Sequence, residues 1–600
     1  MRILFDSQKP LFKDPFGTLS QGQNCRLNIY IPASVGALCA ECILQLDNCA
    51  DSIVVPMEKT AEQSAYQIFS GNFSLEQNGL YFYYFRIYKP DSSFRLFKQG
   101  NHTNMEAGDR WQLTCTPGDF TTPDWAKGAI IYQIFPDRFY SSGAPNLTGK
   151  LTPYTVHENW NAEVEWRPNE NGEVLNNDFF GGNFQGITKK MDYIATLGTT
   201  ILYLNPISKS FSNHRYDTGD YKIPDPMLGT LEDFTAMCDA AHERGIKVIL
   251  DGVYSHTGSR STYFESACQS QDSPYYSWYT FYEYPHKYNS WWGFDTLPTV
   301  NKSDPAFMDY IIDAEDSVIA HWLQLGADGF RLDVVDELPD EFVLRLKKRI
   351  RKLKPDALLL GEVWEDASNK ISYGIRRRYF VDGELDSCMN YPFRTAVLNF
   401  AKGIDDGTQF QETVMAIAEN YPPQVLACNM NLLSTHDTPR ILTALADDFT
   451  GTREQYAARK LSVNQKEQGK KLLMLSAFLQ YALPGSPSIY YGDEAGSEGH
   501  KDPFNRRTYP WGKEDTELLA HFKGLGRLRK GNPILRLGDI SFFYAKDGKL
   551  GFSRTLEGKT LRIYANRSNA PWTIPQGKVL YACNLAEQLM PMGYCIMEES

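Results

Sequence analysis

The sequence lacks the excess of basic residues that nucleic acids and anionic membranes attract. Its 61 Lys and Arg are outnumbered by 73 Asp and Glu, so the formal net charge is -12 over 600 residues. No apolar run is long enough to cross a bilayer, and the first residues, MRILFDSQKPLFKDPFG, lack the uninterrupted apolar region of a signal peptide. We therefore expect no nucleic acid and no membrane as partner.

Cysteine is also used without a pattern. The 11 cysteines are scattered from Cys25 to Cys595, and no C-x-x-C pair is followed by a second pair or by histidines at the spacing of a zinc site. Cys39 and Cys42 come nearest, but they have no second half. The odd number and loose spacing are typical of reduced thiols, which predicts a cytoplasmic location.

The two ends of the chain indicate β domains. Residues 1–118 contain short β-branched and aromatic runs, such as CRLNIYIP and GLYFYYFRIYKP, bounded by Gly, Asn and Pro. This pattern favours an N-terminal β-sandwich. Strand alternation returns after about residue 530, so residues 531–600 are predicted to form a small C-terminal β-sandwich domain.

The middle of the chain alternates strands with helices. The helix-like LEDFTAMCDAAHERG, for example, lies between the apolar runs TILYLNPI and IKVILDGVYSH. Such alternation over about 400 residues predicts an α/β fold, a (β/α)8 TIM barrel formed by residues 119–256 and 303–530. Residues 257–302 are an aromatic-rich insertion after the third strand. Such aromatic side chains can pack on one another, or they can stack on the apolar faces of sugar rings, and we weigh the two alternatives equally.

Several apolar runs end in ionisable residues. The run GFRLDVVDEL (329–338) has Arg331 and Asp333 on one face of a strand, although a buried charge is costly unless it is paired or used. Three other apolar runs end in the same way. The first ends with Asp251 and His256, the second with Glu362, and the third with His436 and Asp437. A single Asp at a strand end, such as Asp251, is more often a helix cap or an ion-pair partner. Four strands with this ending predict one shared site, because the carboxyl ends of barrel strands converge.

The chemistry of this predicted site follows from its carboxyl groups. Arg331 is expected to keep Asp333 ionised, as a nucleophile requires, and Glu362 is expected to hold a proton that it can donate. Two carboxyl groups in these roles carry out retaining glycoside hydrolysis. Asp437 would accept hydrogen bonds from sugar hydroxyls, and the two histidines would bind hydroxyls as well.

Four segments carry a family resemblance. DGVYSH, GFRLDVVDE, GEVWED and LLSTHD resemble, in order, the signature regions of the α-amylase family of glycoside hydrolases. NHRYDTGDY, FFGGNFQGI, SPSIYYGDE and HKDPFNRR resemble its supporting segments, so the similarity runs from about 128 to 510. The β-rich N-terminal domain and the segment MNYPF are similar to the neopullulanase, cyclomaltodextrinase and maltogenic amylase group.

The resemblance implies a role for each matching residue. Asp333 would be the nucleophile, Glu362 the general acid/base and Asp437 the transition-state stabiliser. Tyr216 would stack under the sugar at the cleavage point, and Trp364 would line the acceptor side. The remaining substrate-binding residues implied by the resemblance are Arg331, His256, His436, Asp251, and the pair Asp502 and Arg506, which would grip the neighbouring glucose.

The sequence departs from the family at its calcium positions. Ser255 stands where many members have an asparagine ligand, Asn183 stands where the maltogenic group has an aspartate, and YSSGAPNLTG has no carboxylate. Because carboxylates are the main calcium ligands, we predict no metal and no cofactor. Glu365 stands where the group commonly has histidine, which would alter acceptor preference.

The implied activity is retaining hydrolysis of α-1,4 links in maltooligosaccharides, cyclodextrins, pullulan or starch. Some α-1,6 cleavage or transglycosylation would fit the same site. Two alternatives stay open: a non-hydrolytic glucan-binding relative, and a glucosyl isomerase or transferase. The resemblance also implies a homodimer through residues 1–118.

Overall fold

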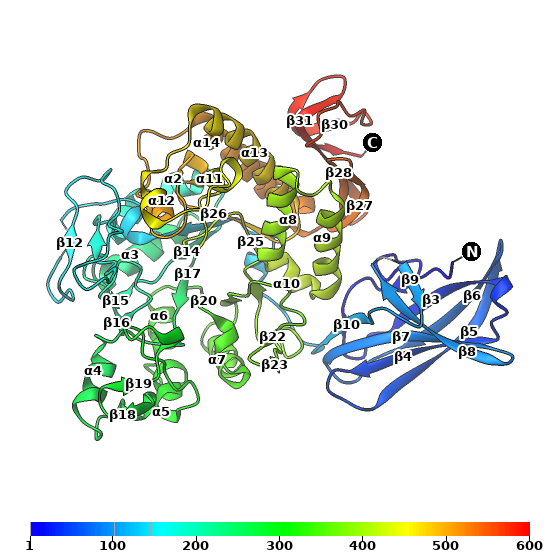
Figure 1. Cartoon of the computed structure of the whole chain (residues 1–600), viewed down its shortest axis with the longest axis horizontal. Coiled ribbons are helices and arrows are strands. Elements are labelled where there is room, and N and C mark those ends of the chain that lie inside the picture. The colour runs from blue at the N-terminus through cyan, green and yellow to red at the C-terminus, as the bar shows by residue number, and fades with distance from the viewer. Residues whose placement is uncertain (1, 101, 145, 600) are drawn as a thin grey trace. The chain divides into compact units, whose positions relative to one another are not determined.

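The computed structural model describes residues 2–100, 102–144 and 146–599. The chain divides into two compact units (Figure 1). The first consists of residues 1–121, 366–386 and 412–426, and the second of residues 122–365, 387–411 and 427–600.

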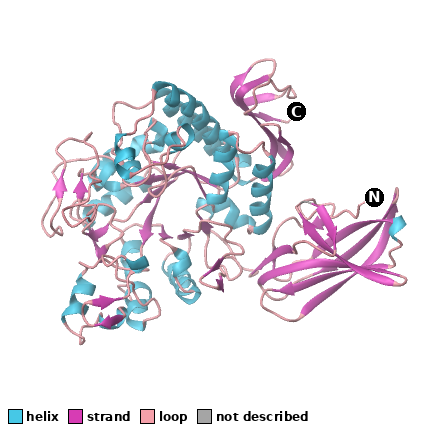
Figure 2. Cartoon of the chain, viewed as in Figure 1, coloured by secondary structure: helices cyan, strands magenta, loops and turns pink. Residues whose placement is uncertain are grey.

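The first unit is built on antiparallel strands (Figure 2). Its main strands are β3 (Cys25–Pro32), β4 (Cys39–Leu46), β5 (Ser52–Gln63), β6 (Tyr66–Phe73), β7 (Gly79–Lys89) and β10 (Trp111–Thr116), paired in the order β3-β6-β5-β4-β7-β10. Along β7, buried residues alternate with partly exposed ones, as in a sheet with one covered face. The rings of Phe5, Phe85 and Trp111 meet edge to face in the core. The predicted N-terminal β-sandwich is confirmed.

Segments from later in the chain complete this unit. The Gln112 side chain on β10 donates to the Ser368 hydroxyl at 2.8 Å and accepts from Asn369 at 2.8 Å. Thr114 donates to the carbonyl of Asn420 at 3.0 Å. Residues 366–386 and 412–426 therefore belong to this unit, although they come later in the chain.

The second unit contains a closed parallel barrel surrounded by helices (Figure 2). Its strands are β11 (Ile131–Ile134), β14 (Ile201–Leu204), β17 (Lys247–Gly252), β20 (Gly329–Leu332), β21 (Leu358–Gly361), β24 (Ser387–Cys388), β25 (Met430–Leu432) and β26 (Ser486–Tyr490). They are hydrogen-bonded in the order β24-β21-β20-β17-β14-β11-β26-β25, and a parallel bridge between Met389 and Met430 joins the two ends. This confirms the predicted (β/α)8 barrel.

Local sequence explains the alternation of elements. The strands β11, β14, β20 and β21 are buried at every position, as expected for parallel strands covered on both faces. Helix α3 (Leu231–His242) begins with a capping box formed by Thr230 and Asp233. It buries Phe234, Met237, Cys238 and Ala241, which are spaced to share one helix face. Helix α7 (Asp340–Leu353) buries one face in the same way.

The aromatic insertion follows β17, the third barrel strand in chain order. It contains α4 (Thr262–Gln269) and a small hairpin of β18 (Phe281–Glu283) and β19 (Lys287–Tyr288). Much of the cluster packs on itself, since Trp278 is buried and lies against Tyr263. Trp292, in contrast, is 72% exposed. Self-packing therefore accounts for part of the aromatic content and not for all of it.

The chain after the barrel forms the predicted C-terminal β domain, a five-stranded antiparallel sheet. Its strands are β27 (Asp539–Lys546), β28 (Lys549–Leu556), β29 (Lys559–Asn566), β30 (Lys578–Leu585) and β31 (Leu589–Glu598). Arg554 on β28 donates to the carbonyl of Ala482, the last residue of α13 (Val463–Ala482), at 2.7 Å. A guanidinium at a helix C-terminus offsets the partial negative charge there, so this contact ties the sheet to the barrel.

Within the described part of the chain, no helix is both long and apolar enough to traverse a membrane.

The amino end of β20 carries a buried ion cluster. The Asp328 carboxylate lies 2.7 Å from His242, 3.2 Å from Lys247 and 2.7 Å from Lys354, and it accepts the Val248 N–H at 2.9 Å. Burial opposes the charge of Asp328, but these donors outweigh that effect and hold the pKa of Asp328 well below its usual value. The ionised form therefore stabilises the fold.

We expect Asp328→Asn to destabilise the protein by about 2 to 4 kcal/mol at neutral pH. Because the native pKa is depressed, this stabilisation is fully present above the pKa of the unfolded chain, about 4, and it is lost as the pH falls below that value toward the lowered native pKa. Thermal unfolding at pH 3 to 8 should show a difference from wild type that shrinks below pH 4. A difference that does not vary with pH would contradict this account.

Candidate active site

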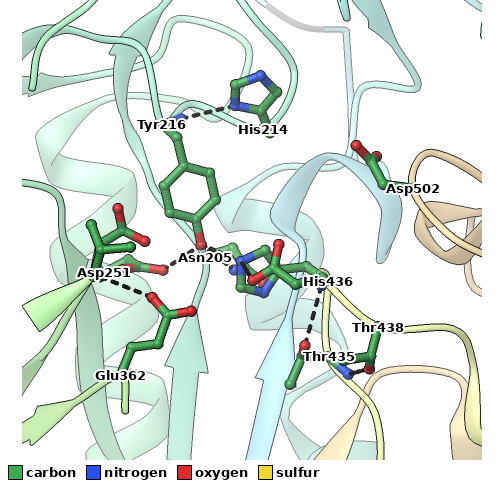
Figure 3. Close-up of polar contacts among 12 residues, drawn as sticks. Asn205, His214, Tyr216, Asp251, Glu362, Thr435, His436, Thr438 and Asp502 are labelled. Atoms are coloured by element: carbon green, nitrogen blue, oxygen red, sulfur yellow. Dashed lines mark hydrogen bonds and ion pairs between the residues drawn. The ribbon is translucent and has the colours of Figure 1, made fainter. Parts of the chain in front are cut away.

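The ionisable residues at four strand ends meet at the carboxyl end of the barrel. Asp251 lies on β17, Arg331 on β20, and Glu362 directly after β21. The side chains of Asp251 and Glu362 lie near those of Tyr216 and His436 (Figure 3). The predicted convergence of remote residues is thus present in the structure.

Arg331 connects three of the carboxylates. Its Nη1 lies 2.7 Å from Asp251 Oδ1 and 2.8 Å from Asp333 Oδ1, and its Nη2 lies 2.7 Å from Glu362 Oε2. The Arg331 and Asp251 side chains are fully buried. A charge inside this strand is therefore accommodated because one guanidinium pairs with several carboxylates.

The electrostatic balance at Asp333 differs from the expectation. Burial raises the pKa of Asp333 most, and Glu362, Asp251 and Asp437 raise it further. Arg331 lowers it, but the net pKa lies well above its usual value. Arg331 acts on Asp333 in the expected direction, but it is shared with Asp251 and Glu362, and burial and the neighbouring carboxylates oppose it.

Glu362 is held by donors on both oxygens. Its Oε2 accepts the backbone N–H of Val334 at 2.8 Å, and its Oε1 accepts the indole N–H of Trp364 at 3.1 Å. Val334 has φ 37° and ψ 54°, a left-handed conformation that is strained for a β-branched residue. The chain after Asp333 thus takes a costly conformation in which its amide contacts Glu362.

Tyr216 and His436 form a second group beside the carboxylates (Figure 3). Their rings stack at 5.3 Å with an angle of 11°. The Tyr216 hydroxyl donates to Asp251 Oδ2 at 2.8 Å and also contacts Nε2 of His436. Burial lowers the pKa of His436 well below its usual value, so this ring is neutral and can offer an N–H to a hydroxyl group.

Three polar residues in this group were not predicted from the sequence. Tyr203 donates to Asp251 at 2.7 Å, Asn205 donates to Tyr216 at 3.1 Å, and Gln133 donates to both Asn205 and His436 at 3.0 Å. Tyr203 and Asn205 are two residues apart at the end of one strand. The same alternation that singles out Arg331 and Asp333 would have identified them.

Asp437 lies at the more open side of the site. Its carboxylate is 3.0 Å from His436 Nε2 and 3.6 Å from Arg506, and its side chain is 32% exposed. Loss of solvent and then the charge of Glu362 raise the pKa of Asp437 to about 7. Arg506 also pairs with Asp502 at 2.9 Å, so the predicted pair lies next to Asp437.

His256 is buried and contacts the insertion rather than the carboxylates. Its Nδ1 lies 2.8 Å from the Ser255 hydroxyl, and its ring centroid is 5.2 Å from that of Trp291. Burial lowers the pKa of His256 to about 3, so the ring is uncharged at neutral pH. Its predicted role in binding hydroxyls remains a prediction.

The residues at the family's calcium positions have other partners. Asn183 caps helix α1 (Phe184–Lys189) by accepting the Gly186 N–H at 2.8 Å, and its amide donates to the Ser142 carbonyl at 2.9 Å. Ser255 contacts His256. The amide N–H of Asn183 points at the Ser142 carbonyl, and a donor in that position cannot bind a cation. The residues at these two positions therefore do not fit calcium. Among the described residues, no three His, Cys, Asp or Glu side chains are grouped as metal ligands.

We expect the melting temperature to change by less than about 1 °C when EDTA replaces calcium in the buffer, because a ligand stabilises only a fold that binds it. Differential scanning fluorimetry with either additive would measure this. A rise of several degrees with calcium would contradict the prediction.

The comparisons with known proteins agree with this geometry. A family model described as the alpha amylase catalytic domain matches residues 133–527, so the chain belongs to the α-amylase family of glycoside hydrolases. The chain is 36% identical to an amylopullulanase of Thermoanaerobacter thermohydrosulfuricus over 92% of its own length and 40% of the relative. It is 35% identical to a cyclomaltodextrinase of Geobacillus thermopakistaniensis, over 76% of this chain and 71% of the relative.

Solved structures show the same similarity. The type III pullulan hydrolase from Thermococcus kodakarensis matches with a TM-score of 0.69 and 27% identity over the full length of both chains. The chain spans about a third to a half of the length of the amylopullulanases that it matches. Cyclomaltodextrinase, neopullulanase and maltogenic amylase relatives are all among its matches, so the predicted resemblance is confirmed.

Proposed function

We propose that the chain is a retaining α-glucan hydrolase that cleaves α-1,4 links and, to a smaller extent, α-1,6 links. The observation that supports this most is that Asp333 and Glu362 contact the same buried guanidinium of Arg331. Their carboxyl groups are therefore adjacent, and retaining enzymes place the two groups about 5 Å apart, whereas inverting enzymes leave room for a water.

In the proposed first step, Asp333 attacks the anomeric carbon while Glu362 donates its proton to the departing glycosidic oxygen. A proton on Glu362 removes one negative charge beside Asp333, which favours the ionised nucleophile. Protonation of the acid and ionisation of the nucleophile thus support each other. In the second step, Glu362 takes a proton from water, which attacks the anomeric carbon and releases Asp333. A sugar hydroxyl in place of that water would give transglycosylation.

The other residues are proposed to bind and orient the sugar. Asp437, beside His436 and Arg506, would accept hydrogen bonds from ring hydroxyls as positive charge develops. The Tyr216 ring would lie against the apolar face of the sugar, since its hydroxyl is fixed by Asp251. Asp502 and Arg506 would contact the adjacent glucose, and Trp364 would line the acceptor side.

The substrate range is tested by one activity panel. The relatives are named for action on pullulan and cyclodextrins, so we propose both as substrates, together with starch and maltotriose. Each would be incubated with the protein, and the products would be separated by chromatography. Reducing sugars with retained anomeric configuration by NMR are expected. Isomerised or transferred products without net hydrolysis would favour a glucosyl isomerase or transferase, and no reaction would refute the proposal.

We also propose a homodimer through residues 1–118. This domain exposes large apolar side chains at Leu11, Leu38, Val54 and Met105, which suits association with another surface. Light scattering at micromolar concentration is expected to give about twice the mass of one chain. Only monomer at that concentration would contradict the proposal.

A further inference from the structure

The two oxygens of Glu362 have different surroundings. Oε2 lies 2.7 Å from Arg331 Nη2 and accepts the Val334 N–H at 2.8 Å. Both neighbours only donate, so a proton on Oε2 would face two donors without an acceptor. Any proton that Glu362 transfers is therefore carried by Oε1.

Oε1 contacts the indole of Trp364. The Trp364 N–H donates to it at 3.1 Å, which occupies one of its acceptor positions and leaves another for a proton. One face of the Trp364 ring lies on Tyr391, with centroids 3.9 Å apart and an angle of 10°. Tyr391 is buried and begins helix α8 (Tyr391–Lys402), so the indole is supported from a rigid element.

Trp364 is not enclosed by the protein. Trp364 is 46% exposed although its N–H is directed at Glu362. An indole that only packed against Tyr391 would not need this orientation. The Trp364 ring, supported by Tyr391, thus holds its indole N–H against Oε1 of Glu362, the oxygen that carries the proton.

We propose that Trp364 is a positioning residue for Glu362: its indole N–H orients Oε1 and stabilises the carboxylate that remains after proton transfer. This inference rests on the proposed function. In the first step the Oε1–H bond breaks, the proton moves to the glycosidic oxygen, and the N–H then donates to the anionic Oε1. In the second step Oε1 regains a proton from the attacking water. The strength of this hydrogen bond thereby affects the pH above which the acid form is lost.

Other charged groups also act on Glu362 and must stay constant in a test. The ionisable groups that face it or share its arginine are Arg331, Asp251, Asp333, Asp437, Tyr203 and Tyr391. Trp364→Phe changes none of them, and phenylalanine can still stack on Tyr391. A change in the pH profile of this variant therefore reports the lost N–H.

The experiment compares kcat/KM for maltotriose from pH 4 to 9 in wild type and Trp364→Phe. We expect the alkaline limb of the variant to move up by about 0.5 to 1 pH unit, because a donor to the charged form is lost. At the optimum, kcat should fall more than KM rises. With an aryl maltoside whose leaving group needs no protonation, the two proteins should react at similar rates.

The matched control is Trp125→Phe, which also removes an indole N–H, here one that donates to the Asp356 carbonyl at 2.8 Å away from the site. Its pH profile should equal that of wild type. Trp364→Tyr serves as a second test if the phenylalanine variant fails to fold. An unmoved alkaline limb, or a change confined to KM, would overturn the inference and leave the proposed function intact. Inactive wild type on every α-glucan would refute the proposed function itself, and the inference with it.

Discussion

Asp333→Asn is expected to lower kcat for α-glucans by about 10^4-fold or more, with the fold intact. The amide is a poor nucleophile, so no covalent glycosyl-enzyme can form. Asparagine has nearly the same shape and can still contact Arg331, which lies 2.8 Å from Asp333. Steady-state hydrolysis of maltotriose and thermal unfolding would measure the two effects.

A small external nucleophile gives this prediction a second readout. In Asp333→Ala, azide can enter the space left by the missing carboxyl group and attack an activated aryl glucoside, which would form a glucosyl azide of inverted configuration. The matched control is Asp192→Asn, at an exposed aspartate paired with Arg244, and its activity should equal that of wild type. Near-normal hydrolysis by Asp333→Asn would show that another residue is the nucleophile.

The position of the site could be predicted from the sequence because barrel topology converts a local pattern into a shared location. Asp251, Arg331 and Glu362 each follow an apolar run, and strands of one barrel end at one face. The β domains at both ends could be predicted from alternation alone. The resemblance of four short segments then suggested a role for each residue.

The energetic balance within the site could not be predicted in this way. Whether Asp333 is ionised depends on how far it is buried and on how many carboxylates share Arg331, and neither is visible in a linear pattern. The stack of Trp364 on Tyr391 joins residues 27 positions apart on different elements, and the strain at Val334 is a property of the folded backbone. The grouping of residues 366–386 with the N-terminal strands likewise depends on contacts such as that between Gln112 and Ser368, which have no local sequence signal.

Asp437→Asn is expected to change activity and stability in opposite directions. Loss of the carboxylate should lower kcat/KM by about 10^3-fold or more, because the proposed site would no longer offer a charged acceptor as the sugar becomes cationic. At the same time the variant should be more stable than wild type at neutral pH. In the native protein this carboxylate is crowded by Glu362 and partly removed from water.

The sign of the stability change follows from the raised pKa of about 7. Below about pH 4 the carboxyl group is neutral in both folded and unfolded chains, so the amide should bring no gain. Between pH 4 and 7 the carboxyl group of Asp437 ionises freely in the unfolded chain but not in the folded one. Wild type therefore loses stability relative to the variant over this range. The gain should reach about 1 to 2 kcal/mol above pH 7, less than full linkage would give because the side chain reaches solvent.

Melting curves of wild type and Asp437→Asn at pH 4, 5.5, 7 and 8.5 would test this dependence. A matched control is Asp192→Asn, whose exposed carboxylate should give no gain that develops over this range. A stability gain at pH 7 together with lost activity would mean that the site keeps an unfavourable cluster of carboxylates for its chemistry. A variant less stable than wild type at pH 7 would instead mean that the contacts of Asp437 with His436 and Arg506 outweigh the repulsion from Glu362, and the crowding argument would be wrong.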